Sequence, residues 1–405
     1  MLFVGYASLC TLATSYELLN MQTLQMSEPE EPALTASGRL RIASSSDGAQ
    51  LCNLFGSVPM SGDLVLSTRR EPDFFALYRM QGGAFETHVY ERDARLTGMG
   101  SFLVRDGWMD GEPCKVGYLG DLRGTHAAAR ERAIARLYGP LLDEVSERLG
   151  CTIFLTSVMS SNRAALRALT QRTVRRACQP HYHPLRSYTA TAVQFLKMRR
   201  PARQHDFHVR TATPEDLRAL EALLAEDHRQ RPFGWRFDSG ELRHRLASWP
   251  GYSLARTYLA FRSDGALVGC ATAWDPTPVK RYLVHQYRGA LRWLRLAIQS
   301  WALVSRISAL PRPGEAFRYF YLVNVSVREE NPAVFRAILE RIYADYQRAG
   351  YHFFSVYQDQ NDPLAPALAG FFTRSLAFQL FAVTPSRIRR TEFPPGRTGF
   401  EIALA

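Results

Sequence analysis

The fold is decided by an apolar stretch that ends in two charged residues, VGYLGDLR at residues 116–123. Its pattern predicts a β-strand, and a helical pattern follows from about Arg130 onward. The same succession returns in the second half of the chain, where Tyr321-Leu322-Val323-Asn324-Val325 aligns with Tyr118-Leu119-Gly120-Asp121-Leu122. The chain is therefore expected to contain two diverged copies of one unit.

Three further pairs of segments support this repeat, because they occur in the same order in both copies. They are residues 41–47 with 210–216, 93–98 with 264–269, and 152–157 with 352–357. In the first pair, Ser44 stands three residues before Asp47, and Thr213 three residues before Asp216, which predicts a capping box at a helix start. The succession of strands and helices in each copy predicts an α/β protein with a mixed sheet.

The repeat also divides the chain. Residues 1–38 are interpreted as a leader or a misplaced start, because the end of this segment is acidic and rich in Pro and Ser. The first domain is expected over 39–200 and the second over 201–405, with a polar linker between them. An insertion at about 277–313 carries a predicted amphipathic helix from Tyr282 to Leu310. This helix either packs on a domain or serves as a membrane-surface or dimerisation helix.

The strand at 116–123, followed by a loop and by Arg130-Glu131-Arg132-Ala133-Ile134-Ala135, resembles the central strand and pyrophosphate loop of the GNAT superfamily of N-acetyltransferases. In that family the loop has the pattern Gln/Arg-x-x-Gly-x-Gly/Ala, and the N-terminal end of the next helix holds the coenzyme A pyrophosphate. Here Ala133 replaces the first glycine, which keeps the N–H donor but narrows the approach of the phosphate. The resemblance implies two tandem GNAT-like acyl-CoA N-acyltransferase domains, each with a mixed, mostly antiparallel sheet flanked by helices.

The resemblance also implies site residues in the first domain. Asp121 is the candidate catalytic base, because a carboxylate near the end of the central strand can take the proton of an attacking amine. Its alternative roles are to cap a neighbouring helix or to pair with Arg123. The predicted coenzyme-binding residues are Leu122, Arg123, Arg130, Ala133, Ala135 and Asn162.

The second domain lacks this chemistry. Asn324 aligns with Asp121 and cannot accept a proton, so the second domain is expected to be degenerate and to support the first. The family's tyrosine, which protonates the leaving thiolate, is missing from the helix after Asn162. Tyr182 or Tyr188 is the candidate substitute.

The composition and the residue spacing limit the kinds of binding partner that we expect. The net charge is +12, but the chain has no basic run with interleaved aromatic residues, so nucleic acid is not an expected partner. The six cysteines are scattered and indicate reduced thiols in a cytoplasmic protein. His181 and His183 share a strand face without an identifiable third ligand, so no metal is expected. No stretch is apolar enough to predict a membrane span, and a homo-oligomer stays open.

These observations favour an enzyme, an N-acyltransferase that uses acetyl-CoA or another acyl-CoA and acts on an unknown small-molecule or peptide amine. The alternative is a non-catalytic tandem module that binds a ligand or a protein. Ala133 and the missing tyrosine support that alternative.

Overall fold

The computed structural model describes residues 38–57, 59–60, 62–125, 133–171, 178–199, 206–305, 307–390 and 392–404. The predicted leader and Arg130 therefore lie outside the described residues. Residues Gly38–Ala405 form one compact unit. The division of this unit into two domains near residue 200 stays a prediction.

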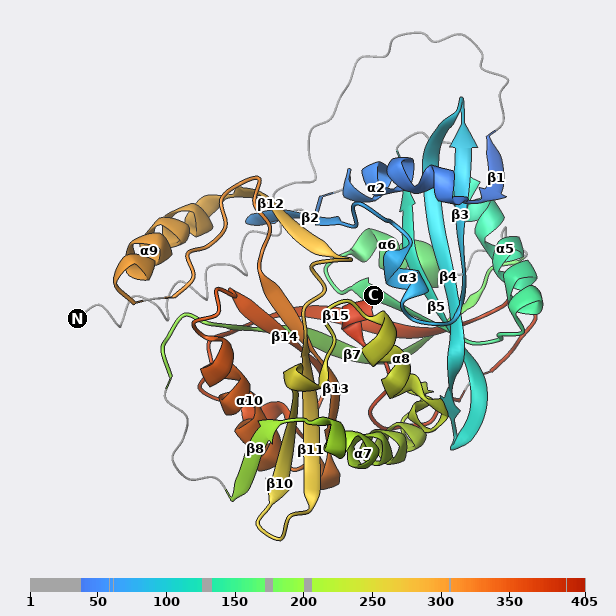
Figure 1. Ribbon diagram of the computed structural model, residues 1–405. Coiled ribbons are helices and arrows are strands. Elements are labelled where there is room, and N and C mark those ends of the chain that lie inside the picture. Colours follow the sequence, from blue (N-terminus) through green and yellow to red (C-terminus); the bar gives the residue numbers. More distant parts are fainter. Residues whose placement is uncertain are drawn as a thin grey trace. The chain divides into compact units, whose positions relative to one another are not determined.

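One large sheet of 13 strands runs through the described part of this unit (Figure 1). Its main path has the order β1-β3-β4-β5-β6-β15-β7-β14-β13-β11-β10-β8, and β9 pairs with β4. Neighbouring strands are antiparallel except for β5–β6 and β13–β14. The predicted mixed, mostly antiparallel sheet is thus confirmed.

The strands of the first half are β1 (Arg39–Ile42), β3 (Ala84–Arg92), β4 (Arg95–Met109), β5 (Glu112–Gly124), β6 (Phe154–Met159) and β7 (His181–Gln194). The strands of the second half are β8 (Phe207–Thr211), β9 (Gly234–Trp235), β10 (Thr257–Arg262), β11 (Leu267–Trp274), β13 (Tyr319–Val327), β14 (Phe353–Asp359) and β15 (Thr373–Thr384).

The two halves exchange their last strands. β15 lies between β6 and β7, and β7 in turn pairs with β14. The order β1-β3-β4-β5-β6, counted from one end of the sheet, corresponds to β8-β10-β11-β13-β14, counted from the other end. The exchanged strands β15 and β7 lie between these two series. A separate two-stranded ladder joins β2 (Leu64–Arg69) of the first half to β12 (Arg281–Tyr287) of the second. These pairings explain why the residues from Gly38 onward form one unit.

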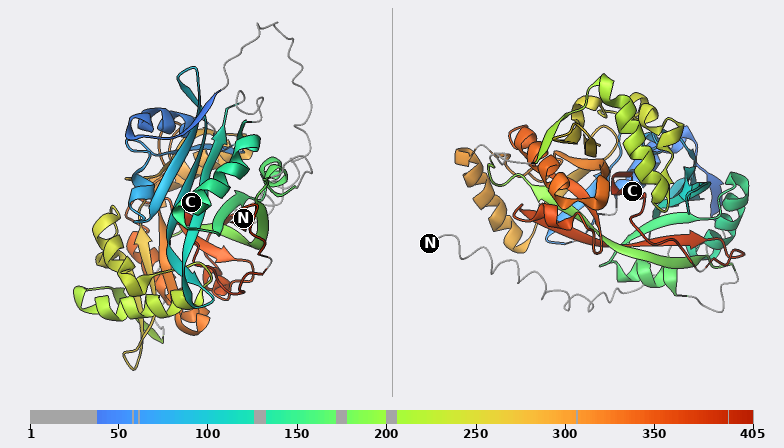
Figure 2. Two further views of the ribbon diagram at one scale, coloured as in Figure 1. Left: turned by 90° about the vertical axis from the view of Figure 1, so that its right-hand side faces the viewer. Right: turned by 90° about the horizontal axis from the view of Figure 1, so that it is seen from below.

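Helices cover both faces of each half. In the first half, Leu54 of α2 packs with Met99 of β4, whereas Val145 of α5 packs with Phe102, which belongs to a different apolar cluster. The two helices therefore lie on opposite faces of these strands (Figure 2, left). α7 and α10 cover the second half in the same way, since they contact alternate residues of β10 and β11. The helices are α2 (Gly48–Gly56), α3 (Ala76–Arg79), α5 (Ala133–Leu149), α6 (Arg163–Thr170), α7 (Leu217–Gln230), α8 (Glu241–Ser248), α9 (Gly289–Ser305) and α10 (Pro332–Tyr346).

Both predicted capping boxes are present. The carboxylate of Asp47 accepts the backbone N–H of Ser44 at 2.7 Å, and that of Asp216 accepts the N–H of Thr213 at 2.8 Å. Each carboxylate also pairs with an arginine six residues earlier in the chain. These hydrogen bonds hold the pKa of both carboxyl groups well below the usual range.

The central strand of each half carries a bulge at the aligned residue. Asp121 in β5 has φ +55° and Asn324 in β13 has φ +53°, a region that non-glycine residues rarely adopt. The register of the neighbouring strand shifts at both places. On the other side, β5 pairs with β6 only at Gly117 and Tyr118, before the bulge. The strands separate beyond this point, and β13 and β14 do so after Tyr321.

The insertion differs in part from its prediction. A helix was expected from Tyr282 to Leu310, but Arg281–Tyr287 forms β12 and the helix α9 begins only at Gly289. The physical reason is that alternating apolar residues in β12 pair with the edge of β2, a partner far away in the sequence.

The close contact between β5 and β6 gives a test of this packing. A Cβ added at Gly117 would lie 2.1 Å from the ring of Phe154, whereas a Cβ at Gly48 meets nothing within 4 Å. We expect Gly117→Ala to lower the free energy of unfolding by about 1–3 kcal/mol, since overpacking strains the core. Gly48→Ala is the matched control and should leave stability unchanged or raise it by up to about 1 kcal/mol. Urea denaturation measures both, and equal stabilities of the two variants would contradict this packing.

Candidate active site

The bulge in the first half is held by a buried ion pair. The carboxylate of Asp121 accepts hydrogen bonds from the guanidinium of Arg70 at 2.6 and 3.2 Å, and from the hydroxyl of Tyr78. The side chains of Arg70 and Asp121 are 2% and 8% exposed. Burial, together with the neighbouring carboxylate, raises the pKa of Tyr78, so this hydroxyl stays protonated and donates.

Arg123 does not pair with Asp121, contrary to one of the sequence alternatives. Its guanidinium donates to the carbonyl of Phe55 at 2.8 Å and lies 4.0 Å from the centre of the Phe55 ring. Residues 121 and 123 would share a face in a regular strand, but the bulge at Asp121 breaks the alternation, and Arg123 contacts Phe55 of α2. Burial lowers the pKa of Arg123.

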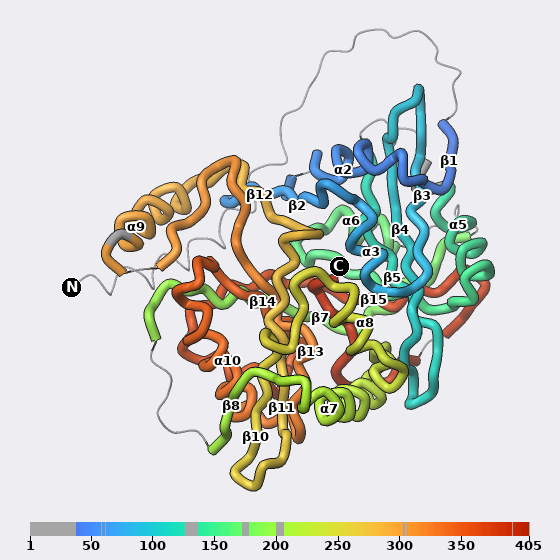
Figure 3. Tube along the Cα trace, in the orientation of Figure 1, coloured from blue at the N-terminus to red at the C-terminus, as the bar shows by residue number. Residues whose placement is uncertain are grey.

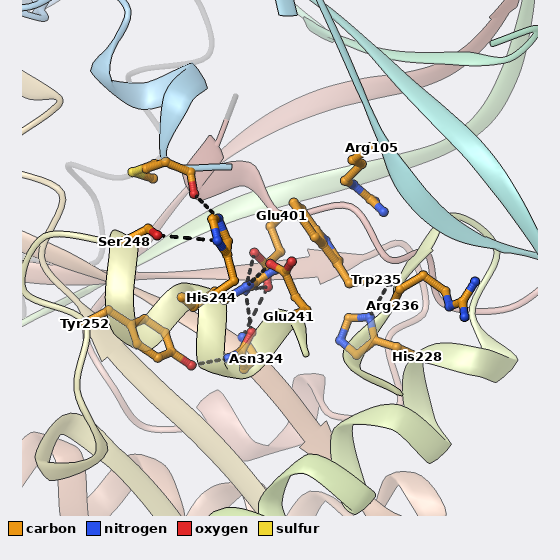
Figure 4. A network of polar contacts seen from close by, with 12 residues as sticks. Arg105, His228, Trp235, Arg236, Glu241, His244, Ser248, Tyr252, Asn324 and Glu401 are labelled. Atoms are coloured by element: carbon orange, nitrogen blue, oxygen red, sulfur yellow. Dashed lines mark hydrogen bonds and ion pairs between the residues drawn. The ribbon is translucent and has the colours of Figure 1, made fainter. Parts of the chain in front are cut away.

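The second half repeats this arrangement with different charges (Figure 4). Arg245, which is fully buried, donates to Asn324 Oδ1 at 2.6 Å, and Asn324 Nδ2 donates to the hydroxyl of Tyr252. Asn324 carries no charge, and Arg245 is neutralised by Glu241 at 2.7 Å and Glu401 at 2.9 Å. An arginine and a tyrosine thus hold the bulge residue in each half.

The end of the chain fills the opening beside the second bulge. Glu401 accepts the backbone N–H of Asn324 at 3.3 Å, and only a cavity of about 30 Å³ remains between residues 322–325 and 397–403. Phe400 contacts three tyrosine rings, Tyr118 of β5 at 6.1 Å, Tyr188 of β7 at 5.5 Å and Tyr357 of β14 at 5.9 Å. The short helix η8 (Ile402–Leu404) follows, in the interior of the unit (Figure 3). The segment from 397 to 404 therefore occupies the second opening.

A buried lysine, Lys280, which no sequence motif marks, lies beside the first bulge. Arg281 of β12 pairs with Arg69 of β2, so the next positions along this ladder bring Lys280 beside Arg70. Burial and the nearby charge of Arg70 lower the pKa of Lys280 to about 7, although Asp121 acts in the opposite direction. The ammonium lies 5.4 Å from the ring of Tyr321. A strongly shifted lysine next to a buried ion pair marks a candidate catalytic position.

The remaining predicted residues lie in different surroundings. Leu122 is 44% exposed at the separation of β5 from β6, and Ala133 and Ala135 stand in the first turn of α5. Asn162 caps α6, where its Oδ1 accepts the N–H of Ala165 at 3.1 Å. Asp121 and Leu122 are therefore neighbours in β5, whereas Asn162 caps the start of another helix, α6.

The two candidate tyrosines lie apart. Tyr188 contacts Ser157 at 2.5 Å and interacts electrostatically with Tyr118, whereas Tyr182 bonds to Tyr138 at 2.8 Å in the apolar layer under α5. Of the two, Tyr188 is the one that interacts with a residue of β5.

Metal sites and membrane-spanning helices are both absent from the residues that the structure describes. His181 and His183 stack at 6.1 Å, and no group of His, Cys, Asp or Glu there has an arrangement that could hold a metal ion. No helix in the described ranges has the length and apolar character needed to cross a membrane.

Comparison with solved structures decides the fold. A GCN5-related N-acetyltransferase from Sphaerobacter thermophilus superposes with a TM-score of 0.52 and 14% identity, over 89% of this chain and 97% of that chain. The chain has a GNAT-type fold. The N-myristoyltransferase of Saccharomyces cerevisiae with bound myristoyl-CoA superposes with a TM-score of 0.55 and 11% identity, over 88% of this chain and 85% of that chain. No protein-family model and no curated protein sequence matches the chain. The resemblance inferred from the sequence is confirmed at the level of the fold.

The lowered pKa of Lys280 predicts a pH dependence of stability. The unfolded chain binds a proton at this lysine up to its ordinary pKa of 10.5, whereas the folded chain loses the proton at about 7. The free energy of unfolding should therefore rise by up to about 1.4 kcal/mol per pH unit from about pH 7 to about pH 9. Lys280→Met should remove this slope. Denaturant unfolding at several pH values measures it, and parallel curves for the two proteins would contradict the assignment.

Proposed function

We propose that the protein is an acyl-CoA-dependent N-acyltransferase in which the first half binds the acyl-CoA and the second half supports the site. The observation that carries the proposal is the bulge at Asp121. It separates β5 from β6 just before α5, whereas the tail of the chain fills the matching opening beside Asn324. The separation of β5 from β6 lies in the half with the coenzyme-like motif, and we assign the acyl-CoA to it.

The backbone of β5 and the start of α5 suit a coenzyme A ligand. Residues Leu122 to Gly124 continue β5 after the last pair with β6, and α5 begins with the helical N–H groups of Ala133 and its neighbours. An N-terminal helix end favours phosphate, and Arg130 just before it adds a positive charge. The pantetheine is expected along β5 and the pyrophosphate at α5.

We assign the proton transfer to Lys280. In N-acylation the amine nitrogen forms a bond to the thioester carbonyl carbon, the carbon–sulfur bond breaks, and the nitrogen gives up a proton. A lysine with a pKa of about 7 is half neutral near neutral pH and can accept that proton. Tyr188 is the candidate donor to the leaving thiolate. The amine acceptor is a small molecule or a peptide.

The predicted role of Asp121 as a base is revised in this proposal. Its two oxygens already accept from Arg70 and Tyr78, and a proton on the carboxylate would break the buried pair. Asp121 acts instead as a positioning residue that fixes the bulge and the charge of Arg70 beside Lys280.

A non-catalytic ligand-binding module is the second candidate. It is favoured by the low exposure of Lys280, 2%, which requires the side chains around it to move before an acceptor can reach the amine. Binding and turnover experiments separate the two candidates.

Ligand binding is tested by thermal shift with acetyl-CoA, octanoyl-CoA and myristoyl-CoA. A ligand at a hundred times its dissociation constant should stabilise the protein by about 2.7 kcal/mol. Ala133→Asp places a negative charge at the start of α5 and should abolish the shift. Ala333→Asp, at the start of α10, is the matched control in the second half and should preserve it. A missing shift with all three thioesters, or equal effects of both variants, would overturn the proposed site.

Turnover is tested by thiol release with a panel of amines. The rate constant kcat/KM of the natural protein should rise with pH through about 7. Lys280→Met should lose this rise and reduce the rate by about 10²- to 10⁴-fold. Asp121→Asn should reduce the rate less and keep the pH profile. A Lys280→Met variant with the natural profile would contradict the role of this lysine, and binding without turnover would favour the non-catalytic module.

A further inference from the structure

Helix α9 presents an apolar face that nothing in the described part of the chain covers. Trp293, Leu296, Trp301 and Val304 are 68%, 44%, 55% and 75% exposed. Their spacing of three, eight and eleven residues after Trp293 places them along one side of the helix. These four residues form the exposed apolar face of α9.

The opposite side of α9 is already packed. Ile298 is 7% exposed, and Leu291 contacts the large apolar cluster of the second half. The helix therefore has two apolar sides, one buried against the protein and one open. A helix that served only to cover the domain would need the first alone.

The surroundings of the open face are basic. Between Asp275 and Glu315 the sequence contains no acidic residue, and Arg288, Arg292 and Arg312 of this segment are exposed. Arg292 lies on the side of α9 next to the exposed apolar face, and Arg288 directly precedes the helix. Both are exposed, and together they form the arginine flank. Arg292 lies 5.8 Å from the ring of Trp293. In Figure 1 α9 lies at the edge of the compact unit, beyond β12.

We propose that α9 docks the protein on the surface of an anionic phospholipid bilayer. The two tryptophans, Leu296 and Val304 enter the boundary between headgroups and acyl chains, and the arginine flank contacts lipid phosphates. This combination of an apolar face with tryptophan and a basic flank is the arrangement that binds in the plane of a membrane interface.

Charge favours a lipid surface over a second copy of the chain. In a two-fold dimer the same face meets itself, so Arg288 and Arg292 of one copy would approach the same arginines of the other. A nucleic acid would satisfy the arginines but would leave Val304 and Leu296 against a polar backbone. An anionic bilayer satisfies both features at once.

The test is co-sedimentation of the full chain with vesicles. Binding is expected with phosphatidylcholine mixed with phosphatidylglycerol, and much less with phosphatidylcholine alone, and it should fall as salt rises. The double variant Trp293→Ser, Trp301→Ser should weaken binding at least tenfold. The double variant Arg288→Gln, Arg292→Gln should weaken it roughly 25-fold, at about fivefold per arginine.

The matched control is Ile42→Ser, which removes an exposed apolar residue of β1 that is 50% exposed. It should leave vesicle binding unchanged, and all variants should keep the thermal midpoint of the natural protein, because the changed side chains are exposed. No binding, or equal binding to neutral and anionic vesicles, overturns the proposal. A concentration-dependent dimer that the tryptophan variant abolishes, with no vesicle binding, assigns the face to a second copy instead.

Discussion

A buried arginine that holds a strand bulge is the interaction on which each half of the structure depends. Arg70 holds Asp121, and Arg245 holds Asn324, with one tyrosine completing each set. A residue at φ near +55° persists only where its surroundings fix it. The fixed bulge turns the central strand away from its parallel neighbour and creates an opening in the middle of the sheet.

The two halves differ because their bulge residues differ in charge. Asp121 neutralises Arg70 directly, so the first set is complete without further carboxylates. Asn324 leaves the charge of Arg245 uncompensated, and an unpaired buried charge is costly, so Glu241 and Glu401 are drawn to it. Glu401 brings the end of the chain into the second opening. A single difference between aligned residues thus accounts for which opening is filled.

The sequence predicted the fold better than the site. The repeat and both capping boxes follow from local patterns, and the proposed role of Asp121 was inferred from its place near the end of its strand. Its true partner, Arg70, lies in another segment, and strand pattern alone does not say which loop covers a strand end. Lys280 was missed because its burial depends on the pairing of β12 with β2. The exchange of β7 and β15 was missed because periodicity defines a strand but not its neighbours.

Binding of acyl-CoA in the first half alone is tested by amide hydrogen exchange with and without an acyl-CoA, because this experiment follows both halves at once. The ligand is expected to slow exchange at Leu122 to Gly124 and at the start of α5, and to leave residues 324–327 and the start of α10 unchanged. Protection centred on Asn324 and α10, or equal protection in both halves, would contradict it.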